Sequence, residues 1–358
     1  MKIAIDCRMY GKSGIGTYIR EILPYLIDIK NNEYILIGDY LKLRHLEAEN
    51  VKIINNNTPI FSLKEFICFP SKEINKCDIF YTPNYNIPGN IKVPIYSTIH
   101  DVVFLDIDEI VGKIGKFIRK FFLKRALKKS KKVFTVSNFS KERIIYHFKP
   151  RIPVEVTYNG ISKFIKEYIK DNLEKKNKNY IKEDYIIYVG NIKKHKGIKI
   201  LLEAYEKAKQ KGYKYKLVIV GKFDNMRTKD KEVLNKIKKL ISTGDIIFTG
   251  YISDQKLLDY IANAEKLVQP SLYEGFGIPP LEALALKVQP IISDIKVFKE
   301  IYSEFPVIFF KNGDSNSLYQ KLMEGMGKSL DRSYIKEIES KYSYKLIANK
   351  LIYEMRES

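Results

Sequence analysis

The chain has no tryptophan, and its 358 residues include only 3 cysteines and 4 histidines. The cysteines, Cys7, Cys68 and Cys77, are odd in number and have neither CxxC nor zinc-ligand spacing, so they predict reduced structural thiols of a cytosolic protein. So few histidines leave little material for a histidine-based metal site. No apolar run reaches the roughly 18 residues that a membrane span needs. Asp6 and Arg8 interrupt the first apolar run, which therefore predicts a β-strand and not a signal peptide.

Acidic residues are fewer than basic ones: 42 Asp and Glu stand against 63 Lys and Arg, which gives a formal net charge of +21. Such an excess is typical of nucleic-acid-binding proteins. Only ten of the basic residues are arginines, however, and arginine is the residue best suited to bidentate contact with guanine or phosphate. The positive charge is also spread along the whole chain. We therefore expect no nucleic-acid partner.

Short runs rich in Val, Ile and Tyr alternate with amphipathic stretches of helical length, a pattern typical of βαβ units with parallel sheets. The predicted strands cover residues 2–6, 34–38, 51–54, 78–83, 93–101, 132–137 and 154–159, and then 185–190, 216–221, 245–250, 266–271, 290–293 and 307–310. The pattern predicts an α/β protein with two Rossmann-like, doubly wound domains.

The domain boundaries follow from the same pattern. We expect an N-terminal domain over 1–160, a lysine-rich linker over 161–184, a C-terminal domain over 185–340 and a closing helix over 341–358. Open α/β sheets bind ligands at the carboxyl ends of their strands. Two such domains facing each other across a cleft would hold one ligand from both sides.

A glycine-rich loop follows the first predicted strand, in GKSGIGTYIREI. Gly14 and Gly16 permit close backbone approach, and the helix that starts near Ile15 offers amides to an anion. Ile19 stands where a dinucleotide fingerprint has its third glycine. The loop is therefore equally compatible with anion binding and with a simple tight turn.

A basic loop, KKHK, opens the second domain between a strand that ends at Gly190 and a helix that starts near Gly197. Cations beside a helix N-terminus suit a diphosphate, because the amides donate hydrogen bonds and lysine supplies charge. We interpret His195 and Lys196 as candidates for that role. The alternative is a solvated lysine loop, which is common in so basic a chain.

The stretch SLYEGFGIPPLEALAL places two carboxylates around a flexible loop that leads into a helix. Glu274 follows the carboxyl end of a predicted strand, and Gly275 and Gly277 let main-chain amides approach a ligand. Glu282 is expected in the first helical turn, where an acid favours the helix dipole without any ligand. A carboxylate beside amides supplies both acceptors and donors, which is what a polyol such as a sugar requires.

SLYEGFGIPPLEA resembles the E-x7-E signature of the retaining glycosyltransferases of family 4, which have the GT-B fold. Further matches follow in the family's order over nearly the whole chain, in GIGTYIREI, YSTIHDVVFL, TVSNFSKERI, YNGIS, YVGNIKKHKG and GYISDQKLLDYIANAEKLVQPS. The resemblance implies an enzyme whose first domain binds a glycan or glycolipid acceptor and whose second domain binds a nucleotide diphosphate sugar.

The resemblance also implies the roles of individual residues. Lys196 would pair with the donor diphosphate, and His195 stands where many members carry arginine. Glu274 would face the donor sugar, with His100 near the anomeric centre as its catalytic partner. The remaining donor-binding candidates are the glycine loop at Gly14 and Gly16, the main chain at Phe276, Gly277 and Ile278, and Glu282 on the ribose.

The pattern looks most like the bacterial polysaccharide and lipopolysaccharide mannosyltransferases, so GDP-mannose is the expected donor and retention the expected stereochemistry. Two other classes stay open: a nucleotide-sugar epimerase on the same fold, and a binding protein with a degenerate site. Asp106-Ile107-Asp108 matches the DxD pattern of metal-dependent glycosyltransferases of the other major fold. Because the chain predicts two α/β domains, we expect no metal and no cofactor, with lysine and helix amides stabilising the leaving diphosphate.

Residues 112–132 hold ten basic residues and no acid, with Ile114, Phe117, Ile118, Phe121 and Phe122 at helical spacing. One interpretation is a helix whose aromatic stripe lies in the core of the first domain. The other adds lysines that contact anionic lipid. The second predicts a cytoplasmic enzyme that is peripheral on the inner face of the plasma membrane.

Overall fold

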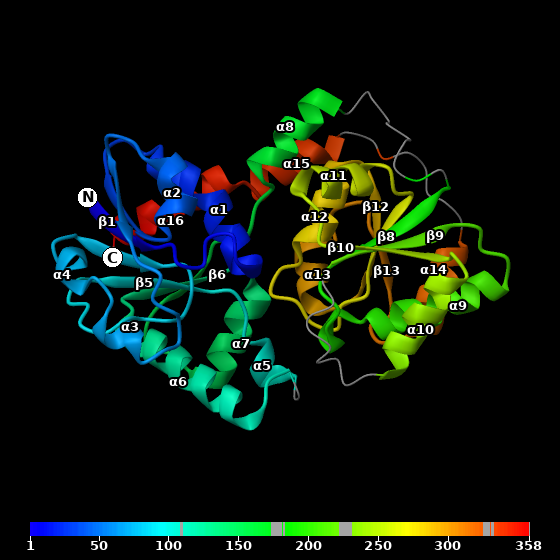
Figure 1. Cartoon of the computed structure of the whole chain (residues 1–358), viewed down its shortest axis with the longest axis horizontal. Coiled ribbons are helices and arrows are strands. Elements are labelled where there is room, and N and C mark those ends of the chain that lie inside the picture. The colour runs from blue at the N-terminus through cyan, green and yellow to red at the C-terminus, as the bar shows by residue number, and fades with distance from the viewer. Residues whose placement is uncertain are drawn as a thin grey trace. The chain divides into compact units, whose positions relative to one another are not determined.

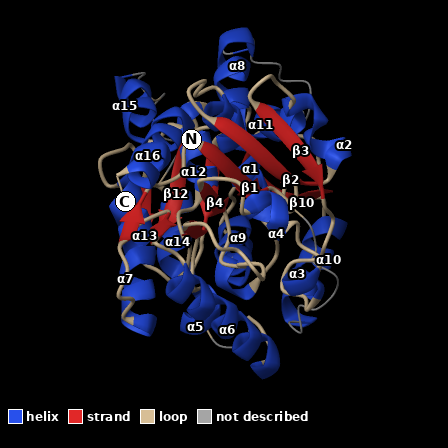
Figure 2. Cartoon of the chain, turned by 90° about the vertical axis from the view of Figure 1, so that its left-hand side faces the viewer, coloured by secondary structure: helices blue, strands red, loops and turns tan. Residues whose placement is uncertain are grey.

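The computed structural model describes residues 1–107, 110–172, 181, 183–221, 231–324, 330 and 333–357. The chain forms two compact units: Met1–Gly160 with Tyr342–Ser358, and Ile161–Lys341. Figure 1 shows that each unit has strands at its centre and helices around them, and Figure 2 shows the red strands of the sheets between blue helices. The prediction of two Rossmann-like α/β domains is confirmed.

In the described residues of the first unit, a 7-stranded sheet has the order β3-β2-β1-β4-β5-β6-β7, and its strands pair in parallel. Most of their side chains are buried, as expected for strands covered by helices on each side. The strands are β1 (Lys2–Asp6), β2 (Glu33–Gly38), β3 (Val51–Asn55), β4 (Ile79–Thr82), β5 (Ile95–Ile99), β6 (Lys132–Thr135) and β7 (Val154–Val156).

Helices cover both faces of this sheet, because alternate residues of a strand point to opposite sides. Ile3 and Ile5 pack in one core cluster with α1 and α16, whereas Ala4 packs in a second cluster with α4 and α6. The helical elements are α1 (Ser13–Ile27), α2 (Tyr40–Leu43), η1 (Arg44–Leu46), α3 (Lys64–Ile67), α4 (Ser71–Ile74), α5 (Val103–Asp106), α6 (Lys113–Lys129), α7 (Asn138–Phe148) and α16 (Tyr344–Arg356). The predicted closing helix is thus confirmed as α16, which packs in the first unit.

Over its described residues, the second unit has a 6-stranded sheet in the order β10-β9-β8-β11-β12-β13, again parallel throughout. The strands are β8 (Tyr185–Val189), β9 (Lys216–Val220), β10 (Ile246–Gly250), β11 (Lys266–Gln269), β12 (Gln289–Ser293) and β13 (Ile308–Phe310). The helical elements are α8 (Lys163–Asn172), η2 (Lys194–Lys196), α9 (Ile198–Gln210), α10 (Lys231–Ser242), α11 (Asp254–Ala262), α12 (Ile278–Ala285), α13 (Lys296–Tyr302), α14 (Ser315–Met323) and α15 (Ser333–Lys341).

The predicted linker over 161–184 is wrong in its first part. Residues Lys163–Asn172 form α8, which belongs to the second unit. Ile165 and Tyr168, three residues apart, lie on one buried face of this helix, and the Tyr168 hydroxyl donates to Asp259 Oδ1 at 2.8 Å. Phe164, Ile165, Tyr168 and Ile169 stand at helical spacing among three lysines, a helical signal that the linker prediction did not use. Predicted linker residues 173–180 and 182 lie outside the described residues.

The apolar stripe of residues 112–132 is divided between core and surface. Phe122 is buried with Leu123, Ala126 and Leu127 in the core. Ile114 and Phe117 are 78% and 74% exposed, and Ile118 and Phe121 are exposed as well. The interpretation that the whole stripe lies in the core is therefore wrong for the first half of α6. In the described part of the chain, no helix combines the length and the apolar character needed to cross a bilayer.

Candidate active site

The two predicted donor segments meet where the strand order of the second sheet reverses. β8 and β11 are neighbours at the centre of this sheet, and their crossovers leave in opposite directions. The basic loop Lys193–Lys196 follows β8, and the segment from Ser271 to Gly277 follows β11. Ligands of open α/β sheets bind at such a switch point, outside the carboxyl ends of the strands.

Lys196 and Glu274 form an ion pair at this point. Lys196 Nζ lies 2.7 Å from both Glu274 Oε1 and Oε2. The Glu274 side chain is only 9% exposed, whereas Lys196 is 24% exposed. A buried carboxylate requires a partner because its desolvation is costly. The pair thus holds a cation and an anion of the predicted site together.

Two further side chains fix the orientation of Glu274. The Ser271 hydroxyl donates to Glu274 Oε1 at 2.7 Å, and Gln269 Nε2 donates to Ser271 Oγ at 3.1 Å. Both residues are buried. Our sequence reasoning missed them, although a serine and a glutamine directly at the end of an apolar strand were the available signal. The relay holds one carboxylate oxygen of Glu274 independently of Lys196.

The basic loop is also tied to the β11 segment through its backbone. The Leu272 amide donates to the His195 carbonyl at 2.8 Å. Gly197 has a φ of +68°, and a Cβ atom there would lie 1.8 Å from the carbonyl oxygen of Pro270. Only glycine permits this approach. Gly197 also precedes α9, as predicted, so the close contact fixes the start of that helix beside Glu274.

The segment after Glu274 leads into α12, which begins at Ile278 after Gly277 with a φ of +86°. Phe276 is buried and Ile278 is partly buried. Because α12 begins at Ile278, Glu282 is its fifth residue, and the expectation that it lies in the first turn is wrong. The dipole interaction falls off within the first turn. Helix stabilisation is therefore a weaker explanation for the partly buried Glu282 than the sequence suggested.

His195 is neutral at pH 7. Burial, with the neighbouring charges of Lys196 and Lys193, lowers the pKa of its imidazole to about 4, although Glu274 opposes the shift. A neutral imidazole can donate a hydrogen bond to a phosphate oxygen but supplies no fixed charge. In this loop the charge for an anion therefore comes from the lysines.

In the first unit the glycine loop forms the first turn of α1. A Cβ atom at Gly16 would lie 2.2 Å from the Met9 carbonyl oxygen, whereas one at Gly14 would meet nothing within 4 Å. Gly16 is therefore required by a tight turn, and Gly14 leaves open space next to the first-turn amides, which have no intrahelical acceptor. The tight-turn interpretation thus holds for Gly16, and anion binding beside Gly14 stays a prediction.

His100 lies at the carboxyl end of β5, next to α1. Its ring meets Tyr18 edge-on with 4.9 Å between centroids, and Nε2 lies 3.1 Å from the Pro83 carbonyl oxygen. Because a carbonyl only accepts, Nε2 carries the proton and Nδ1 is left as an acceptor. Burial lowers the pKa of His100 to about 4, while the Pro83 hydrogen bond opposes the shift. His100 is thus a neutral acceptor at pH 7.

We expect acid to destabilise the first unit through His100. As pH falls from 7 to 5, the unfolded chain takes up a proton near 6.5, while the folded protein does not until about 4. The free energy of unfolding is therefore about 2 kcal/mol lower at pH 5 than at pH 7. Urea unfolding at both pH values checks this: the loss should be smaller by that amount in His100→Asn. An equal pH dependence in both proteins would contradict the prediction.

Asp106, the first acid of the DxD pattern, is paired with two bases. Its carboxylate accepts from Arg143 and lies 2.7 Å from His147 Nε2. Asp108, the second acid, lies outside the described residues. Within those residues, no three His, Cys, Asp or Glu side chains come together in a group that could hold a metal ion.

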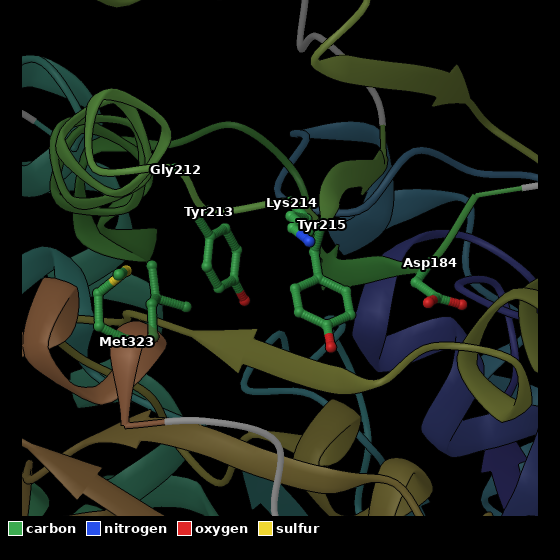
Figure 3. Close-up of a pocket in the computed structure, with 7 residues that line it drawn as sticks. Asp184, Gly212, Tyr213, Lys214, Tyr215 and Met323 are labelled. Carbon is green, nitrogen blue, oxygen red and sulfur yellow. The ribbon is translucent and has the colours of Figure 1, made fainter.

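A hollow of about 420 Å³ in the second unit lies away from the Lys196–Glu274 pair. Asp184 and Tyr215, which line it, directly precede β8 and β9, so it opens at the amino ends of the strands. Figure 3 shows Tyr213 and Tyr215 in this hollow, with Met323 at one side. The candidate site lies at the opposite end of the strands, beyond the carboxyl ends of β8 and β11.

Comparisons with known proteins agree with this geometry. A family model described as "Glycosyltransferase Family 4" matches residues 13–163, and one described as "Glycosyl transferases group 1" matches residues 169–340. The O-antigen chain mannosyltransferase RfbU of Salmonella typhimurium is 30% identical over 341 residues, which cover 90% of each chain. The O-antigen chain mannosyltransferase B of Escherichia coli is 26% identical over 270 residues, or 74% of this chain and 67% of its own.

A solved structure supports the fold. The crystal structure of Anabaena Alr3699/HepE in complex with UDP and glucose superposes with a TM-score of 0.72 at 14% identity, over 100% of both chains. At that identity the likeness concerns the fold alone. The sequence relatives and the two family models identify the chain as a glycosyltransferase of family 4 with the GT-B fold.

Proposed function

We propose that this enzyme transfers a mannosyl group from GDP-mannose to a glycan or lipid-linked glycan, with retention at the anomeric carbon, in the synthesis of a cell-surface polysaccharide. The choice of mannose is supported by the two O-antigen mannosyltransferase relatives. The choice of the donor site rests on one observation, the Lys196–Glu274 pair at the switch point of the second sheet.

The pair explains how the site takes up an anionic donor. Lys196 is the more exposed partner, so its ammonium can move to the incoming diphosphate and leave Glu274 held by Ser271. The diphosphate then receives charge from Lys196 and a hydrogen bond from neutral His195. Glu274 becomes available to the donor sugar, with the amides near Phe276, Gly277 and Ile278 as donors to its hydroxyls, and Glu282 binds the ribose.

We propose front-face chemistry for the transfer. The bond from the anomeric carbon to the diphosphate oxygen breaks, and a leaving phosphate oxygen takes the proton of the attacking acceptor hydroxyl. The positive charge that develops on the sugar is stabilised by the Glu274 carboxylate. For His100 the proposal keeps the role that the family resemblance implies, a neutral acceptor for the donor sugar, and for the loop at Gly14 it keeps the role of a phosphate-binding turn; both roles stay predictions.

Lysine and backbone amides stabilise the leaving diphosphate in this proposal, so neither a metal nor a cofactor is required. The engagement of Asp106 with Arg143 and His147 supports a structural role for that acid. Transfer in the presence of EDTA is expected to proceed at an undiminished rate, and restoration of a lost rate by Mg²⁺ would contradict this part of the proposal.

A thermal-shift panel of GDP, UDP, ADP, GDP-mannose and UDP-glucose tests the donor assignment. We expect GDP and GDP-mannose to raise the melting temperature most, and we expect Lys196→Met to abolish that response because the diphosphate loses its cation. NMR of the anomeric proton in the product then tests retention.

The outcomes of the panel separate the alternatives. A response to UDP and UDP-glucose alone would replace GDP-mannose by a UDP-hexose, a donor class compatible with the ligands of the Anabaena structure. Conversion of the donor without an acceptor would indicate an epimerase. A flat response to every nucleotide would favour a degenerate binding protein.

We further propose that the acceptor is lipid-linked and that the enzyme is peripheral on the cytoplasmic face of the membrane. The exposed Ile114, Phe117, Ile118 and Phe121 on α6 support this location. They alternate with basic residues in a segment without acids. A helix of this composition binds anionic interfaces through buried apolar area and charge.

A further inference from the structure

Two exposed aliphatic side chains lie outside α6 but close to it. Leu63, which directly precedes the short helix α3, is 83% exposed, and Ile67, the last residue of α3, is 82% exposed. We propose that these two side chains and the exposed face of α6 form one surface that lies on an anionic membrane. We call it the α3–α6 face, consisting of Leu63, Ile67, Ile114, Phe117, Ile118 and Phe121. This inference rests on the proposed membrane location and adds a second contact segment to it.

Aromatic contacts around the buried Phe122 join the two segments. The ring of Phe66 stacks on Phe122 of α6 with 6.0 Å between centroids, and Phe61 meets the same ring edge-on at 5.0 Å. The guanidinium of Arg125, also on α6, lies 5.0 Å from the centre of the Phe66 ring. Figures 1 and 2 both show α3 beside α6. The segment 61–67 therefore has a fixed position relative to the helix.

A buried ionic cluster holds this segment in place from within the unit. Arg8 contacts Asp6 at 2.6 Å and Glu65 at 2.5 Å, and these three side chains are at most 5% exposed. Asn86 Nδ2 also donates to Glu65 at 2.6 Å. Glu65 in turn accepts from the amide of Phe61, a residue held at a φ of +58°. Left-handed backbone is unfavourable for phenylalanine and persists only where its surroundings fix it.

This anchoring explains why Leu63 and Ile67 point to solvent. A free loop with two large aliphatic residues would bury them against the domain, because burial of apolar surface is favourable. Here Glu65 and Phe66 occupy the inward positions, so the residues beside them face outward. A built segment that presents apolar side chains is suited to contact an apolar layer outside the protein.

The charges around the face favour an anionic layer over a neutral one. Lys64, Lys113, Lys120 and Lys124 are exposed beside the apolar side chains, and the sequence has no acid from residue 110 to residue 141. A hollow of about 440 Å³ adjoins the face, lined by Phe66, Arg125 and Lys129 among others. Apolar walls next to basic groups suit a lipid headgroup phosphate with its attached chains.

Co-sedimentation at low salt with phosphatidylcholine vesicles containing phosphatidylglycerol tests the proposal. We expect wild-type protein to bind these vesicles and not phosphatidylcholine alone. The double variant Leu63→Asp, Ile67→Asp should weaken binding at least about ten-fold. Leu41→Asp is the matched control: Leu41 is 72% exposed on α2, away from α3 and α6, and its variant should bind like wild type.

Four results would overturn the inference. The double variant could bind like wild type while Phe117→Asp loses binding, which would restrict the contact to α6. Wild type could bind neutral vesicles equally well, or Lys120→Glu with Lys124→Glu could leave binding unchanged, and either result would remove the role of charge. Wild type could also self-associate without vesicles. If the double variant abolished that self-association, the face would be assigned to contact with a second copy of the chain. The nucleotide thermal shift of each variant separates these results from a failure of the proposed enzyme function.

Discussion

Replacing Glu274 by glutamine is expected to lower kcat about 100- to 1,000-fold with only a small change in donor affinity. The amide keeps the size of the side chain and still accepts the hydrogen bond from Ser271. It has no negative charge, however, to stabilise the positive charge that develops on the sugar in the transition state. Interactions made only in the transition state lower kcat when they are removed. Steady-state kinetics, with GDP affinity measured separately, check the result.

Glu282→Ala is the matched comparison, because Glu282 is the second carboxylate of the same motif and is proposed to bind the ribose. We expect it to weaken donor binding while kcat at saturating donor is preserved. The opposite pattern in the two variants would exchange their roles. Wild-type kinetics in both would remove both residues from the site.

Replacing Gly197 by alanine is expected to abolish donor binding. It should also lower the free energy of unfolding of the second unit by more than the strain of a left-handed alanine would alone. The new Cβ would lie 1.8 Å from the Pro270 carbonyl oxygen, and a backbone atom cannot move aside as a flexible side chain can. The clash pushes η2 away from β11 and separates Lys196 from Glu274. Urea unfolding and the thermal shift with GDP measure the two effects.

Gly212→Ala separates the clash from the strain. Gly212 has a φ of +85°, also left-handed, but a Cβ atom there meets nothing within 4 Å. This control should cost only the backbone strain, roughly 1–2 kcal/mol, and should leave the GDP response intact. If the two alanine variants behave alike, the contact between Gly197 and Pro270 does not hold the site together.

The fold was largely predictable because its strands are continuous apolar runs and its long helices are amphipathic. Each predicted strand corresponds to one of β1–β13, and α16 was expected. The exception is α8, which packs against α11 but was predicted as part of a linker from its lysine-rich surroundings, although its apolar residues stand at helical spacing.

For the candidate site, the sequence by itself determined which residue types stand at the ends of which strands, because those positions depend on local patterns. The motif around Glu274 and Glu282 and the basic loop at His195 and Lys196 could be found in this way. Sequence could not determine the protonation of His195. Its pKa of about 4 results from burial and from the nearby charges of Lys196 and Lys193, and both depend on the folded structure.

Tertiary structure decided the interactions between residues far apart in the chain. The Lys196–Glu274 pair joins positions 78 residues apart, and only the sheet order that places β8 beside β11 brings them together. Likewise, helical spacing predicted an apolar stripe on α6, but whether its residues were buried depended on which neighbours packed against it. A local pattern fixes where side chains stand on an element, and the packing of elements fixes what those side chains meet.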